Sequence, residues 1–264
     1  MADTQQVVFY IGAHQDDWQL FMSPQAYYDL IAADTTVVFI YITAGDAGDD
    51  PGWRRGRSAG ALSSIQFARR LPIAAMTPEP VEVRGHPIAS FTIANTRSYY
   101  LDLPDGNQDG AGFPATGGRS IQRLQEGSIP SIEPLVDQPE YATRYTSWED
   151  LTATVRALID REAGDAAGGE RMVHILDPRV SRHSDHKFTG IAVGDAIAGE
   201  ARYRLATYEE YIIPDKEPNL SPIDLVIKSG LYLFYAQTAF EHSGNVQQFD
   251  QWHLSFVPRQ YRTS

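Results

Sequence analysis

Two short clusters of histidine and aspartate are the part of the sequence best suited to chemistry. The first, "HQDD" at 14–17, directly follows the apolar run "VVFYIGA", and the second, "HSDH" at 183–186, lies four residues after the run "RMVHILDP". Aspartate is seldom buried without a partner, so adjacent carboxylates at the end of a buried strand need hydrogen-bond donors or a cation beside them. We therefore expect a divalent metal ion to be held by these clusters.

The spacing of three residues suggests which of them bind the ion. His14 and Asp17 are three positions apart, so on a first helical turn their side chains share one face. His186 would complete a set of two histidines and one carboxylate. The chain has no cysteine, and such ligands suit Zn²⁺ in a catalytic site that keeps water in its open positions. Fe²⁺ and other divalent ions use the same ligands, so spacing alone does not select zinc.

The other charged residues of the two clusters fit catalytic roles. Asp16 points away from Asp17 and is placed to take a proton from water held by a metal. Asp185 lies between two histidines and can orient one of them by accepting a ring N–H. His183 would then act as electrophile or acid toward a developing oxyanion. A simpler alternative is that the carboxylates begin helices and the histidines lie on the surface.

The elements that must position these clusters read as an α/β fold with a mostly parallel sheet. Residues 6–12 and 36–43 are short, apolar, β-branched runs typical of strands covered on both faces, and residues 22–34 between them have helical spacing. This is one βαβ unit. Open sheets of this kind bind ligands at the carboxyl ends of their strands. Further strands are predicted over 80–85, 171–178 and 206–214, and further helices over 57–71, 147–163 and 221–240.

One segment departs from this alternation. Residues 96–145 are dense in Gly, Pro, Asn and Asp, as in "LPDGNQDGAGFPATGG", which predicts an irregular insertion. Long loops inside a compact domain are usually functional or disordered, and the apolar residues here favour an ordered wall or lid over the site. We expect one domain over 1–264 that carries this insertion.

Composition narrows the class of partner. The net charge is −12 and no block of Lys and Arg is long enough to follow a phosphate backbone, so nucleic acid is not expected as a partner. No apolar run reaches the roughly 20 residues of a membrane span. No basic region precedes the strand that begins at Val7, so we expect a cytoplasmic protein without a secretory signal. The oligomeric state is left open.

Taken together, the motifs resemble a known family. "AHQDD" after the first strand, the loop "TAGDAG" after the second, a helix bearing arginine and then "HSDH" resemble the LmbE-like, or PIG-L, deacetylases, from Val7 into the helix "KSGLYLFYAQ". Members of this family are zinc-dependent amidohydrolases with a Rossmann-like fold. They mostly remove acetyl groups from N-acetylglucosamine-type sugars, so the resemblance implies an enzyme that acts on a small glycosylated substrate.

The resemblance assigns roles to individual positions. It implies that zinc is held by His14, Asp17 and His186, that Asp16 is the general base, and that His183, tuned by Asp185, stabilises the oxyanion or protonates the leaving amine. It also implies that an arginine after the glycine-rich loop reaches the site. This is Arg57, with Arg55 as the rival.

The chain departs from the family pattern at two positions. Gln15 stands where the family usually has proline, which leaves the loop less rigid but removes no ligand. Asp46 stands where glutamate is commoner, which puts the role of that acid in doubt.

The substrate class is a narrower question. The insertion and the aromatic residues near it look most like the enzymes that deacetylate glycopeptide-antibiotic precursors of the teicoplanin type, and a large aromatic substrate needs an aromatic wall. Candidates for that wall are Trp18, Tyr99, Tyr100 and Phe113, although these rings can equally anchor the insertion. Alternatives are an N-acetylglucosaminyl inositol or malate of thiol biosynthesis, or a catalytically silent sugar- or metal-binding module. The presence of both Asp16 and His183 argues against the silent module.

Overall fold

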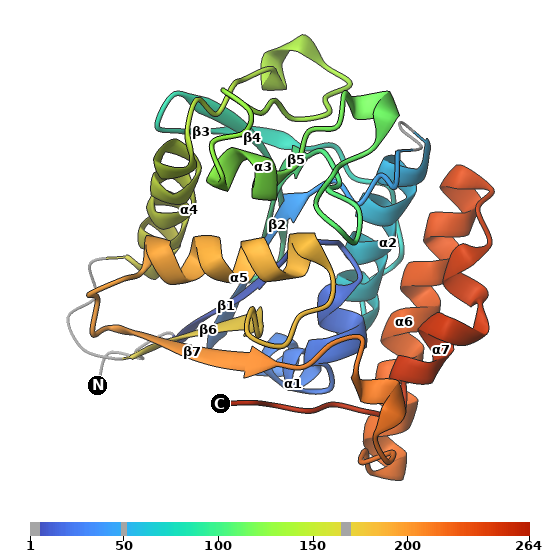
Figure 1. The fold of residues 1–264 in the computed structure, drawn as a ribbon. Helices are drawn as coiled ribbons and strands as arrows, with labels where there is room; N and C mark the ends of the chain where they lie inside the picture. The colour runs from blue at the N-terminus through green and yellow to red at the C-terminus, as the bar shows by residue number, and fades with distance from the viewer. Residues whose placement is uncertain (1–5, 49–51, 165–169) are drawn as a thin grey trace.

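The backbone is built around one seven-stranded sheet. The computed structural model describes residues 6–48, 52–164 and 170–264. The strand order is β3-β4-β5-β2-β1-β6-β7, in which β5, β2, β1, β6 and β7 run parallel and the hairpin β3–β4 is antiparallel (Figure 1). The strands are β1 (Gln6–Gly12), β2 (Thr35–Thr43), β3 (Glu79–Val83), β4 (His86–Ile93), β5 (Thr96–Leu103), β6 (Arg171–Leu176) and β7 (Tyr203–Tyr208).

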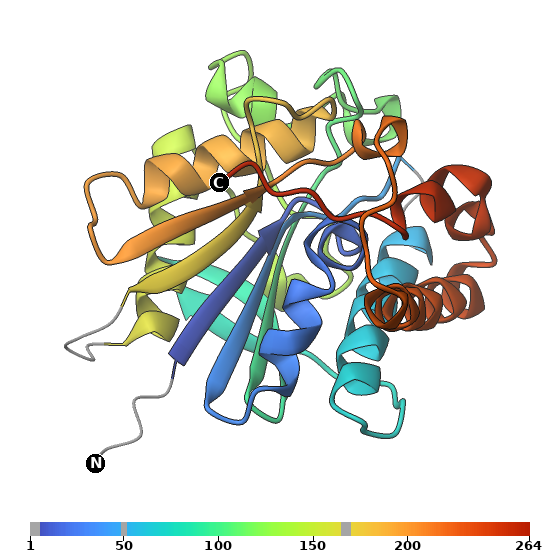
Figure 2. The ribbon, with the colours of Figure 1, turned by 90° about the horizontal axis from the view of Figure 1, so that it is seen from below.

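Helices cover both faces of the sheet, as Figure 2 shows from below. The apolar side chains of alternate strand residues divide into two buried clusters, one packed with α3, α4 and α5 and the other with α1, α2, α6 and α7. This division explains why β1 and β2 are apolar along almost their whole length. The helices are α1 (Gln25–Ile31), α2 (Gly52–Ala68), α3 (Ile121–Gln125), α4 (Trp148–Ala163), α5 (Ser184–Ala196), α6 (Pro222–Ser243) and α7 (Gln251–Phe256). Within the described ranges no helix has the length and apolarity needed to cross a membrane.

The predicted α/β class with a mostly parallel, helix-flanked sheet is confirmed. The strands β4 and β5 and the start of the predicted insertion differ from expectation. The segment 96–145 does not begin as an irregular insertion, because its first eight residues form β5 in the middle of the sheet. Polar Thr96 and Ser98 are buried there among tyrosines, which hides the strand from a hydrophobicity pattern. The strand β4 was not predicted at all. The irregular part is 104–145, which contains α3 and two short 3₁₀ turns, Pro114–Thr116 and Pro139–Tyr141.

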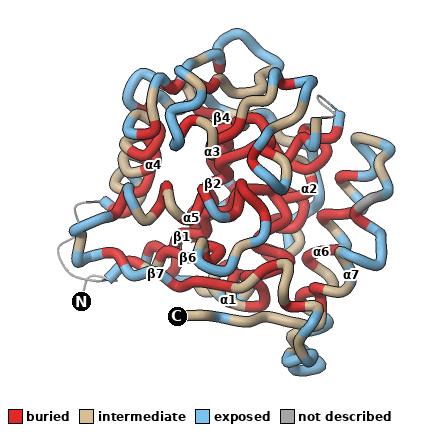
Figure 3. Tube along the Cα trace, viewed as in Figure 1, coloured by how far each residue is buried: buried red, intermediate tan, exposed pale blue. Residues whose placement is uncertain are grey.

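The residues buried in the strands continue into buried loops at the carboxyl ends of those strands, whereas the outer sides of α6 and the irregular segment are exposed (Figure 3).

Two glycines let α2 pack very closely on α6. A Cβ atom built on Gly56 would lie 2.7 Å from the carbonyl oxygen of Ala239, and one on Gly60 would lie 2.6 Å from that of Tyr235. Since backbone atoms cannot yield as a flexible side chain does, α2 has no room for a side chain at either position.

This contact predicts a position-specific loss of stability. Gly60→Ala should force α2 and α6 apart and lower the free energy of unfolding by about 1–3 kcal/mol, the usual cost of overpacking a core. The matched control is Gly194→Ala in α5, where nothing lies within 4 Å of the added Cβ and the better helix propensity should give a neutral or slightly stabilising change. Urea denaturation of both variants measures the difference; equal stabilities would contradict the packing argument.

Candidate metal centre and active site

The two sequence motifs meet at the carboxyl ends of the parallel strands, together with two acids that the motifs do not include. Residues 14–17 follow β1, residues 183–186 open α5 after β6, Asp105 follows β5, and Glu210 follows β7. The histidine, aspartate and glutamate side chains in this group are each at most 7% exposed. So many charged groups are stable away from water only if they pair with one another or with a cation.

One ring nitrogen of His186 lies near a possible ligand atom of each of the other two side chains predicted to bind metal. The Nε2 atom of His186 lies 3.2 Å from Nδ1 of His14 and 3.1 Å from Oδ1 of Asp17. Zinc–nitrogen bonds of about 2.0–2.1 Å in tetrahedral geometry separate neighbouring ligand atoms by about 3.4 Å. These two distances suit ligands of one ion, and three other groups in the cluster also bring possible ligand atoms within 4.8 Å of one another: His14 with His183 and His186, His14 with Asp16 and Asp17, and His14 with Asp105 and Asp185. The ligand set His14, Asp17 and His186 stays a prediction. Gly12 leaves room for the Asp17 carboxylate, because a Cβ there would lie 3.0 Å from it.

The outward-facing ring nitrogens of the two histidines face carboxylates. Nε2 of His14 lies 3.3 Å from Oδ2 of Asp185 and 3.8 Å from Asp105, and Nδ1 of His186 lies 3.7 Å from Oε2 of Glu210. The carboxylate of Asp185 is close enough to hold the ring proton of His14 on Nε2, which leaves Nδ1 with a lone pair for a metal ion. At 3.7 Å, Glu210 makes no hydrogen bond to Nδ1 of His186 and favours a proton on that nitrogen only through its charge. The donor set therefore fits a divalent cation.

The electrostatics of the cluster favour positive charge at its centre. Burial alone would lower the pKa of His186, but the charges of Asp17 and Glu210 outweigh it and raise that pKa well above its usual value. The pKa of His14 is also raised, because Asp185 and Asp105 together outweigh the effect of burial. A bound divalent ion would supply the positive charge that these carboxylates favour without protonating the imidazoles.

His183 has a different environment from the other two histidines. Its Nδ1 accepts a hydrogen bond of 3.1 Å from the backbone N–H of Asp185, so it caps the N-terminus of α5. Burial, reinforced by the charges of His14, His186 and Arg57, lowers its pKa far below the usual range. The ring is therefore neutral near pH 7 with its proton on Nε2, and its centroid lies 4.9 Å from those of both His14 and His186.

The contacts of Asp185 differ from the expected ones. Its carboxylate contacts His14 and accepts hydrogen bonds of 3.0 and 3.1 Å from the backbone N–H of Gly106, while it reaches His183 only through its own backbone. Burial, with the charge of Asp105, raises the pKa of Asp185 to about 6. The carboxylate of Asp185 thus orients His14 rather than His183.

Asp16 lies in the same cluster as Asp17, since its carboxylate and ligand atoms of His14 and Asp17 are within 4.8 Å of one another, and it is also bound from α2. Its Oδ1 accepts a very short hydrogen bond from Nη2 of Arg57, which is itself buried. The rival Arg55 is exposed and pairs instead with Asp137, 2.8 Å away. Of the two arginines considered from the sequence, Arg57 is the one that reaches the cluster.

The two positions that depart from the family pattern both hold the loops at the strand ends. Nε2 of Gln15 donates a hydrogen bond of 3.2 Å to the carbonyl oxygen of Thr43, which ties the first motif to the end of β2. Buried Asp46 accepts from the backbone N–H of Asp105 at 2.8 Å and of Gly48 at 3.0 Å. The shorter acid therefore has a structural task here, because it joins the loop after β2 to the loop after β5.

The rings predicted to line an aromatic wall are mostly core residues. Trp18 is 2% exposed and donates its indole N–H to the hydroxyl of Tyr41 at 3.0 Å. Tyr99 packs with the α4 side of the sheet and Tyr100 with the α2 side, and both are buried. Only Phe113 is partly exposed, and it covers Gly48 in the loop after β2. The expected wall of four rings is therefore corrected: Trp18 packs inside from the turn after β1, and Tyr99 and Tyr100 of β5 are buried on the two helix-covered faces of the sheet.

Sequence reasoning did not single out Asp105 or Glu210. Glu210 belongs to "YEEY", which was assigned to a strand over 206–214, whereas β7 ends at Tyr208. A pair of acids directly after a buried strand is the same signal that marked Asp16 and Asp17, and it identifies Glu210 once the strand end is placed correctly. Asp105 follows β5, a strand that was not predicted.

The fold and this cluster define an α/β protein with a buried histidine–carboxylate centre, able to hold a divalent metal, at the carboxyl ends of its parallel strands. The PIG-L family model, described as GlcNAc-PI de-N-acetylase, matches residues 9–197, and the chain belongs to that family. The match spans both motifs, and it confirms the resemblance stated from the sequence. This family assignment supports an enzyme of the deacetylase kind.

Two solved structures resemble the chain loosely. One is the zinc-inhibited form of teicoplanin deacetylase Orf2, with a TM-score of 0.48 and 12% identity over 89% of this chain and 85% of that one. The other is a deacetylase–teicoplanin complex from the teicoplanin biosynthesis pathway, with a TM-score of 0.41 and 14% identity over 89% of this chain and 87% of that one. No curated protein sequence matches the chain. The family assignment rests on the family model alone.

The contact between Glu210 and His186 predicts a specific effect on metal affinity. Glu210→Gln should weaken Zn²⁺ binding about 10- to 100-fold, the usual effect of removing the carboxylate behind a ligating histidine. Glu209→Gln is the matched control, because that neighbouring carboxylate pairs with Lys216 and not with a histidine. Isothermal titration of the metal-free proteins with Zn²⁺ measures both affinities. Equal affinities in the two variants would contradict the assigned role.

Proposed function

We propose that the protein is a zinc-dependent N-deacetylase that hydrolyses the acetamide of an N-acetylglucosamine conjugate and releases acetate and a free amine. The observation that carries the proposal is the convergence of His14, Asp17 and His186 beside two further groups suited to amide hydrolysis. Those groups are the Asp16–Arg57 pair and the neutral imidazole of His183.

In this proposal His14, Asp17 and His186 hold the metal ion. When bound, such an ion supplies Lewis-acid polarisation of the amide carbonyl and makes water more acidic near neutral pH. Asp185 by a hydrogen bond and Glu210 by its charge favour the tautomer that leaves a lone pair on the inner nitrogen of each ring. Fe²⁺ or another divalent ion fits the same donor set, so zinc is the part of the proposal that metal analysis must decide.

Asp16 is the proposed general base. Its carboxylate is buried next to the proposed ligand Asp17 but is directed at Arg57, so one oxygen is held by the guanidinium while the carboxylate stays beside the centre. A base that is already held in one orientation loses little conformational entropy when it takes a proton from water. After the attack, the same carboxyl group can return that proton to the departing nitrogen.

His183 is the proposed oxyanion donor. The sequence left two roles open for it, as an electrophile or as an acid. With Nδ1 occupied by a backbone N–H and a pKa far below the usual range, the ring keeps a single proton on Nε2 and can donate a hydrogen bond but is not positively charged. We therefore prefer stabilisation of the oxyanion by a neutral imidazole over protonation of the leaving amine.

The molecule to which the acetylated sugar is attached, here called the acceptor, is a separate part of the proposal. The description of the family model supports an N-acetylglucosamine conjugate. A glycopeptide-antibiotic precursor stays a prediction from the motifs, and the burial of Trp18, Tyr99 and Tyr100 removes one argument for it. N-acetylglucosaminyl inositol and malate are the competing acceptors.

The test is release of acetate from a panel of these conjugates, with metal content measured before and after chelation. The proposal predicts release that stops with chelator and returns on adding Zn²⁺. A protein that binds the sugars but releases no acetate from any of them would instead be the catalytically silent binding module.

Two substitutions should separate catalysis from metal binding. Asp16→Ala and His183→Ala should retain bound metal at wild-type stoichiometry but lower kcat by about 10²- to 10³-fold, the typical cost of removing one stabilising donor or base. His253→Ala serves as the control and should leave kcat unchanged, because among the described residues the Nδ1 atom of His253 pairs at 2.7 Å with Asp250, at the start of its own helix α7, and not with the cluster. Normal turnover by His183→Ala would contradict its role as oxyanion donor.

A third substitution tests the ligand set itself. His186→Ala should lose the metal, because it removes the nitrogen that lies between His14 and Asp17. Elemental analysis after dialysis reads the metal content directly and does not depend on knowing the substrate. Metal retained at one ion per chain would overturn the assignment of His186 as a ligand.

A further inference from the structure

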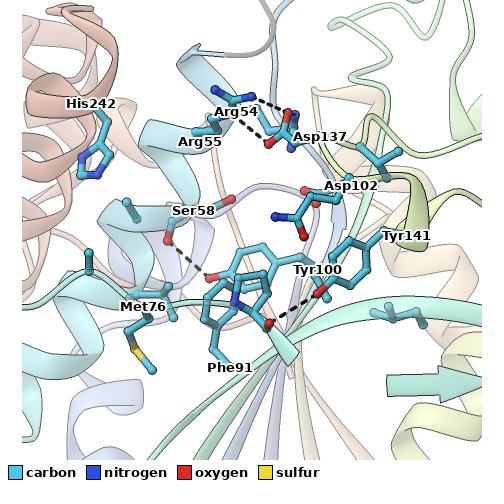
Figure 4. Close-up of a pocket in the computed structure, with 18 of the residues that line it drawn as sticks. Arg54, Arg55, Ser58, Met76, Phe91, Tyr100, Asp102, Asp137, Tyr141 and His242 are labelled. Carbon is cyan, nitrogen blue, oxygen red and sulfur yellow. Dashed lines mark hydrogen bonds and ion pairs between the residues drawn. The ribbon is translucent and has the colours of Figure 1, made fainter. Parts of the chain in front are cut away.

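A second cavity lies on the other side of α2 from Asp16 and has no role in the chemistry above. It has a volume of about 490 Å³, within the range of ligand pockets, and lies between α2, the strands β4 and β5, and the segments 71–78 and 134–145 (Figure 4). None of the clustered histidines and carboxylates at the strand ends lines it. The cavity is thus a separate feature of the fold.

Most of the wall is apolar. The inner end is formed by Leu62, Met76, Ile88, Phe91 and Tyr100, of which Tyr100 is fully buried and Phe91 partly so. Ile73 lines the cavity and is 45% exposed, and its neighbour Leu71 is 42% exposed. The wall therefore continues outward into apolar surface that the described chain leaves uncovered, which is a mark of a binding site rather than of a packing defect.

Several polar groups of the wall have partners within the wall. Asp137 pairs with Arg54 at 2.6 Å and with Arg55 at 2.8 Å, so one carboxylate binds both guanidinium groups at the charged end of the cavity and neutralises one of their two positive charges (Figure 4). The hydroxyl of Tyr100 donates to the carbonyl oxygen of Ser58 at 3.5 Å, and that of Tyr141 to Pro78 at 3.4 Å. A ligand that entered as an ion would have to compete with these pairs, whereas a neutral apolar group would not.

The charged end of the cavity lies close to the catalytic cluster along two chain segments. On α2, Arg54 of the cavity precedes Arg57, the partner of Asp16, by three residues, which is a rise of about 4.5 Å along a helix. At the end of β5, Asp102 of the cavity precedes Asp105, which faces His14, also by three residues. The cavity and the proposed site are therefore joined by two short stretches of chain, although they lie on different sides of α2.

We propose that this cavity binds a neutral aliphatic or aromatic group. That group comes either from an apolar substituent of the sugar conjugate or from a separate small molecule. The first source rests on the proposed function, and the second does not. In both cases the group replaces water at the wall formed by Leu62, Met76, Phe91 and Tyr100, and the driving force is burial of apolar surface.

Binding is tested directly with N-phenyl-1-naphthylamine, a neutral aromatic dye whose fluorescence rises in apolar surroundings. The wild-type chain should bind it saturably at one site. Ala89→Trp fills the cavity from β4 and should weaken binding at least tenfold, whereas Thr92→Trp, on the opposite face of the same strand, should not. Because Ala89→Trp places a large ring at a half-buried strand position, Ala75→Trp, on the exposed segment that lines the cavity, provides a second filling variant checked by its circular dichroism and Tm.

Weak, non-saturable dye binding by the wild type, or equal binding by the filling variants and Thr92→Trp, would overturn the proposal. The dye experiment needs no activity, so its result is independent of the proposed deacetylation.

A second arm identifies the source of the group by comparing octyl and methyl N-acetylglucosaminides. If the group is part of the substrate, the octyl compound should have a KM at least tenfold lower than the methyl compound in the wild type, and Ala75→Trp should abolish that difference while leaving kcat on the methyl compound unchanged. Equal KM values together with saturable dye binding assign the cavity to a separate molecule. Absence of hydrolysis of either compound counts against the proposed function and leaves the dye result standing.

Discussion

The burial of several carboxylates around two imidazoles is the constraint on which the rest of this structure depends. Aspartates 16, 17, 105 and 185 and Glu210 lie within one desolvated region, and mutual repulsion would expel them without compensating positive charge. Arg57 supplies part of that positive charge. The other carboxylates also favour positive charge, because they raise the pKa values of His14 and His186. A site so biased toward a cation is preorganised for a metal ion before any ion arrives.

The scaffold meets this constraint by dividing the task among strand ends. Each of β1, β5, β6 and β7 delivers one acid or one motif at its carboxyl end, and the loops between them are joined by buried hydrogen bonds such as that from the Asp105 backbone to Asp46. The proposed ligands His14 and Asp17 come from the loop after β1, and His186 comes from the start of α5. The geometry is therefore as rigid as the parallel sheet beneath it, which is what a preorganised centre requires.

Much of the fold and site was accessible from the sequence, for identifiable reasons. Continuous apolar runs marked β1, β2 and β6, and the capping serine at 147 marked the start of α4, where its side chain accepts from Asp150. The polar motifs stood out because acids directly after such runs have no packing explanation.

What was missed has equally physical causes. In β5 the buried polar residues and tyrosines interrupt the hydrophobic pattern, and β4 is a partly exposed strand beside the edge strand β3, so neither was predicted. The side of the sheet on which Tyr99 falls, and the burial of Trp18 in the turn after β1, depend on tertiary packing, which no local pattern determines. The contact of Asp185 with His14 joins residues 171 positions apart and is likewise invisible to sequence spacing.

The close packing of α2 on α6 bears on where the folding unit of this protein ends. The family match stops at residue 197, yet Glu210 and the whole of α6 lie beyond it. A fragment that ended at residue 197 would retain both histidine motifs but lose α6, against which Gly56 and Gly60 of α2 pack. The helix α2, which carries Arg57, would then lack that support. The part of the chain that the family model matches is thus shorter than the part whose elements pack together. The last quarter of the chain belongs to the structure that supports the proposed site.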